Sequence, residues 1–117
     1  MITAIAAIVA FLSVALGAFG AHALEGKVDA KAIGWWETGT FYLLTHAIAA
    51  LAIGLSAKDG WYQTGALTLL AGAVLFAATL FAMTLGAPRW LGAITPIGGA
   101  AMLAGWGMIV IAALRGA

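Results

Sequence analysis

The stretch WETGTFYLLTHAIAALAIGL at residues 36–55 decides the fold of this chain. It is as long and as apolar as a membrane-spanning helix, since about 20 residues rising 1.5 Å each cross a hydrocarbon layer of about 30 Å. At 100° per residue, its polar side chains fall within about 100° of one another on one face. These side chains are Thr38, Tyr42, Thr45 and His46. Because lipid cannot satisfy their hydrogen bonds, we expect this face to point at other protein.

The composition of the whole chain excludes an ordinary soluble domain. Of its 117 residues, 65% are hydrophobic and 8% are charged, and the mean hydropathy is +1.12. A soluble domain has roughly 25% charged residues, so this chain cannot cover a water-facing surface and is predicted to be membrane-embedded. The net charge of +1 indicates no nucleic-acid partner. The absence of cysteine excludes disulfides, thiol catalysis and thiolate metal sites.

Four apolar segments are separated by short connections. The segments cover residues 2–24, 36–55, 65–85 and 90–114. Short connections force neighbouring helices to run antiparallel, which predicts an all-α, up-down bundle of four transmembrane helices, a single domain over residues 1–117, with both termini on one side. Lys27, Lys31 and Arg89 lie toward one side of the bundle, against Lys58 and Arg115 on the other, a bias too small to assign an orientation.

Small residues recur at helical spacing and predict close packing between helices. In the first segment Ala6, Ala10, Ser13, Gly17 and Gly20 form one narrow stripe, which lets a second helix approach closely. In the fourth segment a proline is expected to kink the helix or break its first turn, with glycines packing beside the bend. The predicted helix-packing residues are Gly17, Gly20, Gly72, Pro96, Gly98, Gly99 and Gly105.

The border between the first two segments carries a capping signal. Asp29 is suited to cap a short interfacial turn that leads into Trp35 and Trp36, which belong at headgroup depth. Glu37 is expected in the first turn of the second helix, where a carboxylate suits the positive end of the helix dipole. A proton-accepting carboxylate at a pore mouth is the functional alternative for Glu37.

The two histidines are the residues most open to a chemical interpretation. Four-helix membrane bundles can hold haem, but His22 and His46 differ in depth by roughly 10 Å, which argues against a shared iron. Two histidines without a nearby Asp or Cys also make an incomplete metal site, so we expect no metal and no cofactor. We expect His46 to be a neutral, hydrogen-bonded core residue with Tyr42, a threonine or backbone near Pro96 as partner, and a proton relay is the alternative. The indole N–H of Trp106 should also find a partner inside the span.

Neither a catalyst nor a known transporter type is indicated. A small multidrug-type transporter has a similar length, but it needs a buried carboxylate, and no acidic residue lies in the middle of any segment. Ser13 and Ser56 have no evident His or Asp company, and no nucleotide-binding glycine motif is present. We therefore expect a protein that is not an enzyme.

Three motifs in order resemble one family. They are GAFGAHAL at 17–24, the series Trp36, Thr38, Tyr42 and His46-Ala47, and TPIGG at 95–99 followed by Gly105-Trp106. Together they resemble the domain-of-unknown-function family 423, the YgdD-like small inner-membrane proteins, which have a related small transmembrane protein in animal mitochondria. The resemblance implies four helices in the cell inner membrane and no established activity. The signature positions are Gly17, Gly20, His22, Trp36, Tyr42, His46, Thr95, Pro96, Gly98, Gly99 and Trp106.

The signature positions suggest one polar pocket in one half of the bilayer. We expect His22, Tyr42, His46 and Thr95 to line it and Trp36 to close it, around a lipid headgroup, a small solute or ordered water. The first expectation for function is a non-enzymatic packing protein, a homo-oligomer or an accessory subunit of a larger membrane complex, with membrane lipid around it. The alternatives are a small transporter or channel, or a lipid-binding protein, that uses the pocket at His46.

Overall fold

Four long helices make up nearly the whole protein. The structure, a computed structural model, describes residues 1–116, and its helices are α1 (Ile2–Phe19), α2 (Ala30–Leu55), α3 (Trp61–Thr84) and α4 (Thr95–Leu114). A π-helical turn, η1 (Gly20–Leu24), continues α1, and a 3₁₀ turn, η2 (Arg89–Ala93), precedes α4. With these turns, each of the four is long and apolar enough to cross a membrane. The predicted all-α fold with four transmembrane helices is confirmed.

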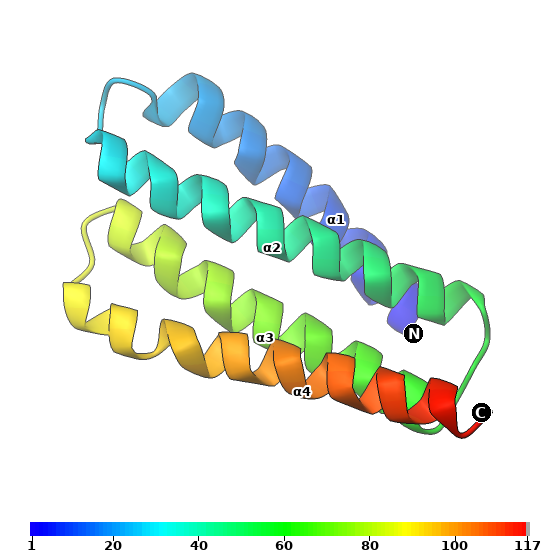
Figure 1. The fold of residues 1–117 in the computed structure, drawn as a ribbon. Coiled ribbons are helices and arrows are strands. Elements are labelled where there is room, and N and C mark those ends of the chain that lie inside the picture. Colours follow the sequence, from blue (N-terminus) through cyan, green and yellow to red (C-terminus); the bar gives the residue numbers. More distant parts are fainter. Residues whose placement is uncertain (117) are drawn as a thin grey trace.

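The helices run antiparallel to their neighbours, and both chain ends lie at the same end of the molecule (Figure 1). The overall dimensions are 49 × 26 × 18 Å. Each of the three connections contains a glycine with positive φ, which L side chains rarely adopt: Gly26, Gly60 and Gly86. These short turns produce the up-down order expected from the sequence.

The bundle is an open zigzag. Each helix packs mainly on the next one in the chain: α1 on α2, α2 on α3, and α3 on α4. Within residues 1–116, no Cα of α2 lies within 8 Å of a Cα of α4. In Figure 1, α2 and α4 lie on either side of α3. A groove is therefore left between α2 and α4, with α3 as its floor. A second, wholly apolar groove lies between α1 and α3 and is lined by Leu12, Leu16, Val74 and Ala78 among others.

The second helix begins six residues earlier than predicted. The helix starts at Ala30, because the Asp29 carboxylate accepts the Ala32 N–H at 2.8 Å and fixes the first turn, as the capping signal indicated. Glu37 is thus the eighth residue of α2, and the expectation that it occupies the first turn is wrong. The third helix likewise starts at Trp61 instead of residue 65. Hydropathy marks the part of a helix that crosses lipid, whereas caps mark its ends.

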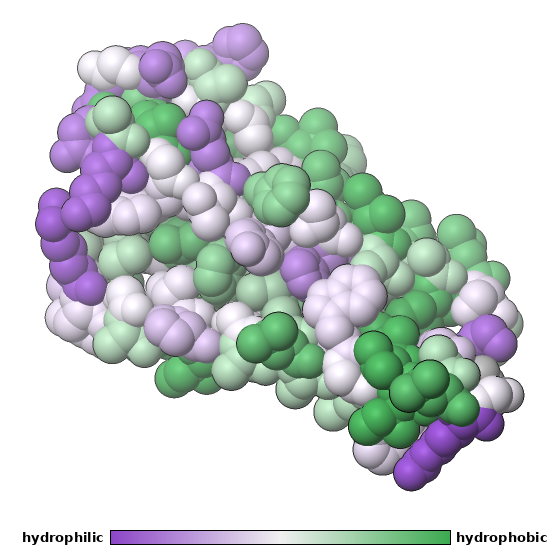
Figure 2. Space-filling model, viewed as in Figure 1, coloured by the Kyte–Doolittle hydropathy of each residue, from purple (hydrophilic) through white to green (hydrophobic). Residues whose placement is uncertain are grey.

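Cations and aromatic rings define the two borders of the span. At one end Lys31 Nζ and Arg89 Cζ lie 5.9 and 5.5 Å from the centroid of the Trp35 ring. At the other end Lys58 lies over Tyr62 and Arg115 over Trp61, at 5.2 and 5.6 Å. Figure 2 shows most of the strongly hydrophilic residues at the two ends of the molecule, with mainly green and pale surface between them. Such aromatic belts are typical of headgroup depth.

Glycines allow the helices to approach closely at several points. A Cβ added to Gly98 would lie 2.7 Å from the Gly72 carbonyl oxygen, and one added to Gly105 would lie 2.9 Å from that of Gly65. On α1, a Cβ at Gly17 would lie 3.2 Å from Thr40 Cγ2, and one at Gly20 would overlap the Trp36 indole. These contacts join α3 to α4 and α1 to α2.

Two predicted packing residues do not pack in this way. No atom lies within 4 Å of the position that a Cβ would take on Gly99, and Pro96 is an exposed residue of the first turn of α4. The packing prediction is corrected for both. Gly99 follows Gly98 by 100° around the helix, which turns it away from α3.

Candidate functional site

The five residues of the predicted polar pocket are not brought together. His22 is exposed on η1, Trp36 is buried against α1, and the Thr95 hydroxyl lies 2.7 Å from that of Thr79 on α3. Only Tyr42 and His46 border the same cavity. Helix geometry explains the separation, because Trp36 and Tyr42 are about 120° apart around α2. The single pocket is therefore corrected to a site around Tyr42 and His46.

The His46 imidazole forms hydrogen bonds through both of its nitrogens. Its Nδ1 lies 2.8 Å from the Tyr42 carbonyl oxygen and 3.2 Å from the Thr45 hydroxyl, and the Trp106 indole donates to Nε2 at 3.1 Å. A carbonyl only accepts and an indole N–H only donates, so in this arrangement Nδ1 donates to the carbonyl and Nε2 accepts from the indole. The side chain is 8% exposed. His46 is therefore a fully bonded imidazole that links α2 to α4.

A groove of about 620 Å³ lies between α2 and α4 beside this bond. Its lining residues come from three helices: Tyr42 and His46 from α2, Phe76 from α3, and Pro96, Gly99, Ala100, Met102, Leu103 and Trp106 from α4. From Pro96 to Trp106 it extends about 15 Å at 1.5 Å per residue. The groove ends at Trp106, near the middle of α4, and opens sideways to the bilayer instead of leading across it.

Two hydroxyls on the polar face of α2, of which that of Tyr42 borders the groove, have no partner within residues 1–116. Tyr42 is 38% exposed and Thr38 is exposed, and neither hydroxyl forms a hydrogen bond with a described residue. The expectation that this whole face points at protein is thus wrong for Thr38 and Tyr42. Tyr42 lies seven residues below Trp35 on the same face, about 10 Å inside the border. Its hydroxyl must find a partner from outside the chain or remain unsatisfied in hydrocarbon.

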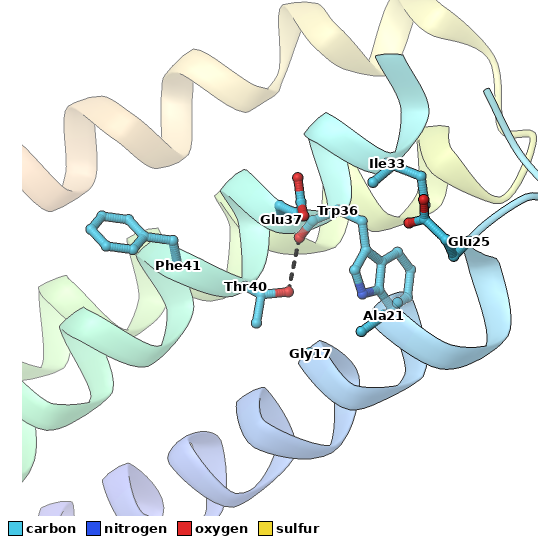
Figure 3. Close-up of a pocket in the computed structure, with 9 residues that line it drawn as sticks. Gly17, Ala21, Glu25, Ile33, Trp36, Glu37, Thr40 and Phe41 are labelled. Atoms are coloured by element: carbon cyan, nitrogen blue, oxygen red, sulfur yellow. Dashed lines mark hydrogen bonds between the residues drawn. The ribbon is translucent and has the colours of Figure 1, made fainter. Parts of the chain in front are cut away.

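A smaller pocket of about 280 Å³ lies between η1 and α2 (Figure 3). The Trp36 indole extends from α2 toward α1 and donates to the Leu16 carbonyl at 2.7 Å, while Thr40 donates to the Trp36 carbonyl at 2.8 Å. Glu25 and Glu37 also line this pocket, and both are exposed. Its buried polar groups are satisfied, so the larger groove is the better candidate site.

Several residues of the site were not predicted. Phe76, Met102 and Leu103 form the apolar walls, and nothing in their local sequence distinguishes them from other lipid-facing residues. By contrast, the stacking of Lys31 on Trp35 follows from their i, i+4 spacing and could have been found.

Fold and site together define an integral membrane protein that crosses the bilayer four times. Inside the span the hydrogen bond between His46 and Trp106 links α2 to α4, and a groove beside it is open to lipid.

The chain belongs to the DUF423 family, described as proteins of unknown function, whose profile matches residues 16–99. It is 42% identical over 113 residues to the UPF0382 membrane protein YwdK of Bacillus subtilis, covering 93% of this chain and 92% of that one. It is 37% identical over 113 residues to the UPF0382 inner membrane protein YgdD of Escherichia coli K12, covering 94% and 86%. No solved structure matches. The predicted family and the multi-pass inner-membrane localisation are confirmed.

Proposed function

We propose that this is a non-enzymatic membrane protein that takes a lipid from the side into the groove between α2 and α4. The observation that carries the proposal is the groove itself, which is open to the bilayer and combines apolar walls with the unpartnered Tyr42 hydroxyl. Small-molecule sites are mostly apolar clefts with a few placed polar groups. A lipid suits both features, because its acyl chain is apolar and its ester and phosphate oxygens accept hydrogen bonds.

The bonding of the reactive side chains supports a binding role in preference to catalysis or transport. Both nitrogens of His46 are engaged, and the Ser13 and Ser56 hydroxyls donate to carbonyls of their own helices at 2.8 and 2.6 Å. A proton could reach His46 Nε2 only after the Trp106 bond breaks. The groove also stops near mid-membrane, so this arrangement offers no path across the bilayer.

A packing role remains a second candidate, because α4 has small residues on its outer surface. No atom lies within 4 Å of a Cβ position on Gly107, and Ala104 is exposed nearby. Small residues let a helix of a second copy, or of a larger complex, approach closely in lipid. In that case a protein helix, instead of a lipid, would cover this side of α4.

The proposal is tested by filling the groove. Gly99→Leu places a large side chain in the groove, whereas Gly107→Leu makes the same change on α4 outside its lining. After purification in mild detergent, mass spectrometry of co-migrating molecules should show a bound lipid that Gly99→Leu removes and Gly107→Leu retains. A protein that co-migrates in place of lipid and is lost in either variant would support the packing role and refute lipid binding.

A further inference from the structure

The groove has a positively charged mouth. Lys31 from α2 and Arg89 from η2 both lie over the Trp35 ring, at the end where α2 and α4 begin. Trp35 and Tyr42 share one face of α2, so this pair of cations lies above the groove at headgroup depth. Both side chains are exposed. Both cations lie within 5.9 Å of the centre of the same ring.

Carboxylates at the same end do not neutralise this mouth. The Asp29 carboxylate is engaged by the first turn of α2, where it accepts the Ala32 N–H. Glu25 and Glu37 line the pocket on the η1 side, and Glu37 is about 200° around α2 from Trp35. No ion pair with N···O within 4 Å joins Lys31 or Arg89 to a carboxylate of residues 1–116. Lys31 and Arg89 are therefore cations at the mouth without a carboxylate partner among the described residues, available to an anion from outside the chain.

Below the cations, polar and apolar groups follow in the order of a phospholipid. The Thr38 hydroxyl lies about 5 Å deeper than Trp35 and the Tyr42 hydroxyl lies on a residue about 10 Å deeper, both without partners among the described residues. The apolar groove then continues past Phe76 and Leu103 to Trp106. Because Gly99 has no side chain, the groove has room for one acyl chain along α4.

We propose that this groove holds one anionic phospholipid, with its phosphate between Lys31 and Arg89, its ester oxygens at Thr38 and Tyr42, and one acyl chain beside Trp106. The proposal rests on lipid binding as the function of the groove and adds the class of lipid. Near a membrane surface each Lys or Arg contributes about 1 kcal/mol toward an anionic lipid, which corresponds to about fivefold in affinity. Losing both cations should therefore weaken binding about 25-fold.

The test compares phosphatidylglycerol with phosphatidylcholine carrying the same acyl chains. The purified full chain is titrated with each lipid in mild detergent, and binding is followed by native mass spectrometry and by the rise in unfolding temperature. The wild type should prefer phosphatidylglycerol. Lys31→Gln with Arg89→Gln should abolish the preference, whereas Lys27→Gln with Lys58→Gln, an equal change in charge away from the groove, should retain it.

The possible failures are distinguishable. If both lipids bind equally and Gly99→Leu removes both, lipid binding stands and the anionic preference is refuted. If Gly99→Leu leaves the binding of both lipids unchanged, the groove is not the lipid site, and both proposals fail. If Lys27→Gln with Lys58→Gln lowers the preference as much as the groove pair does, the effect is general surface charge, and the anionic site is refuted.

Discussion

The imidazole of His46 is held between a carbonyl of its own helix and an indole sixty residues further along the chain. The sequence indicated separately that His46 needs a partner near Tyr42 and that Trp106 needs an acceptor. It could not pair them, because the pairing depends on how α2 and α4 are rotated on α3. For the same reason the sequence predicted Thr95 beside His46, whereas the Thr95 hydroxyl in fact faces that of Thr79.

Trp106→Phe should lower the free energy of unfolding by about 1 kcal/mol, since interhelical hydrogen bonds in membranes contribute on that scale. The change leaves the acceptor nitrogen of a buried imidazole without its donor. Unfolding of the purified protein by a denaturing detergent measures the loss. Trp90→Phe is the control, because Trp90 is 65% exposed at the border, and an equal loss in both variants would show that the Trp106 bond contributes nothing.

At the scale of the elements, hydropathy located all four spans but placed the start of α2 six residues too late, because Asp29 was assigned to a short turn before the helix. The rotations of α2 and α4 about their axes were not accessible. The stripe of small residues that ends at Gly20 packs on α2. Because His22 lies about 200° around the helix from Gly20, the stripe by itself indicates that His22 points away from α2. The π-helical geometry of η1 has no recognisable sequence signal here.

The adjacent glycines of α4 give a matched test of helix packing. A Cβ on Gly98 would lie 2.6 Å from the Phe76 backbone nitrogen, so Gly98→Ala must push α3 and α4 apart, at a cost of about 1–3 kcal/mol. Gly99→Ala meets open space and should be neutral or slightly stabilising, by up to about 1 kcal/mol. Detergent unfolding of the two variants makes the comparison, and similar stabilities would contradict the α3–α4 contact described above.

For the whole molecule, the open zigzag explains how so apolar a chain can present a site to the bilayer. A closed bundle would cover the α2 face, whereas here α2 and α4 are separated, and among the described residues one hydrogen bond, between His46 and Trp106, joins them. Composition predicted that helices cross the membrane, but the choice between a closed and an open arrangement depends on glycine contacts such as Gly72 with Gly98. These contacts bring α4 tightly onto α3 and leave it away from α2.

The orientation of the molecule should respond to very few charges. Three cations, Lys27, Lys31 and Arg89, lie at one end, and two, Lys58 and Arg115, at the other, so we expect both orientations to coexist. Asp59→Lys with Gln63→Lys changes the balance to three against four and should move the population toward a cytoplasmic 56–60 connection.

Because the chain has no cysteine, Ala30→Cys and Ser56→Cys can be labelled singly with a membrane-impermeant maleimide on intact cells. Without the two added lysines, the cysteine at either site should be labelled in only part of the molecules. With them, the cysteine of Ser56→Cys should be protected from the maleimide. Labelling that stays the same would mean that the orientation is set by something other than this balance of charges.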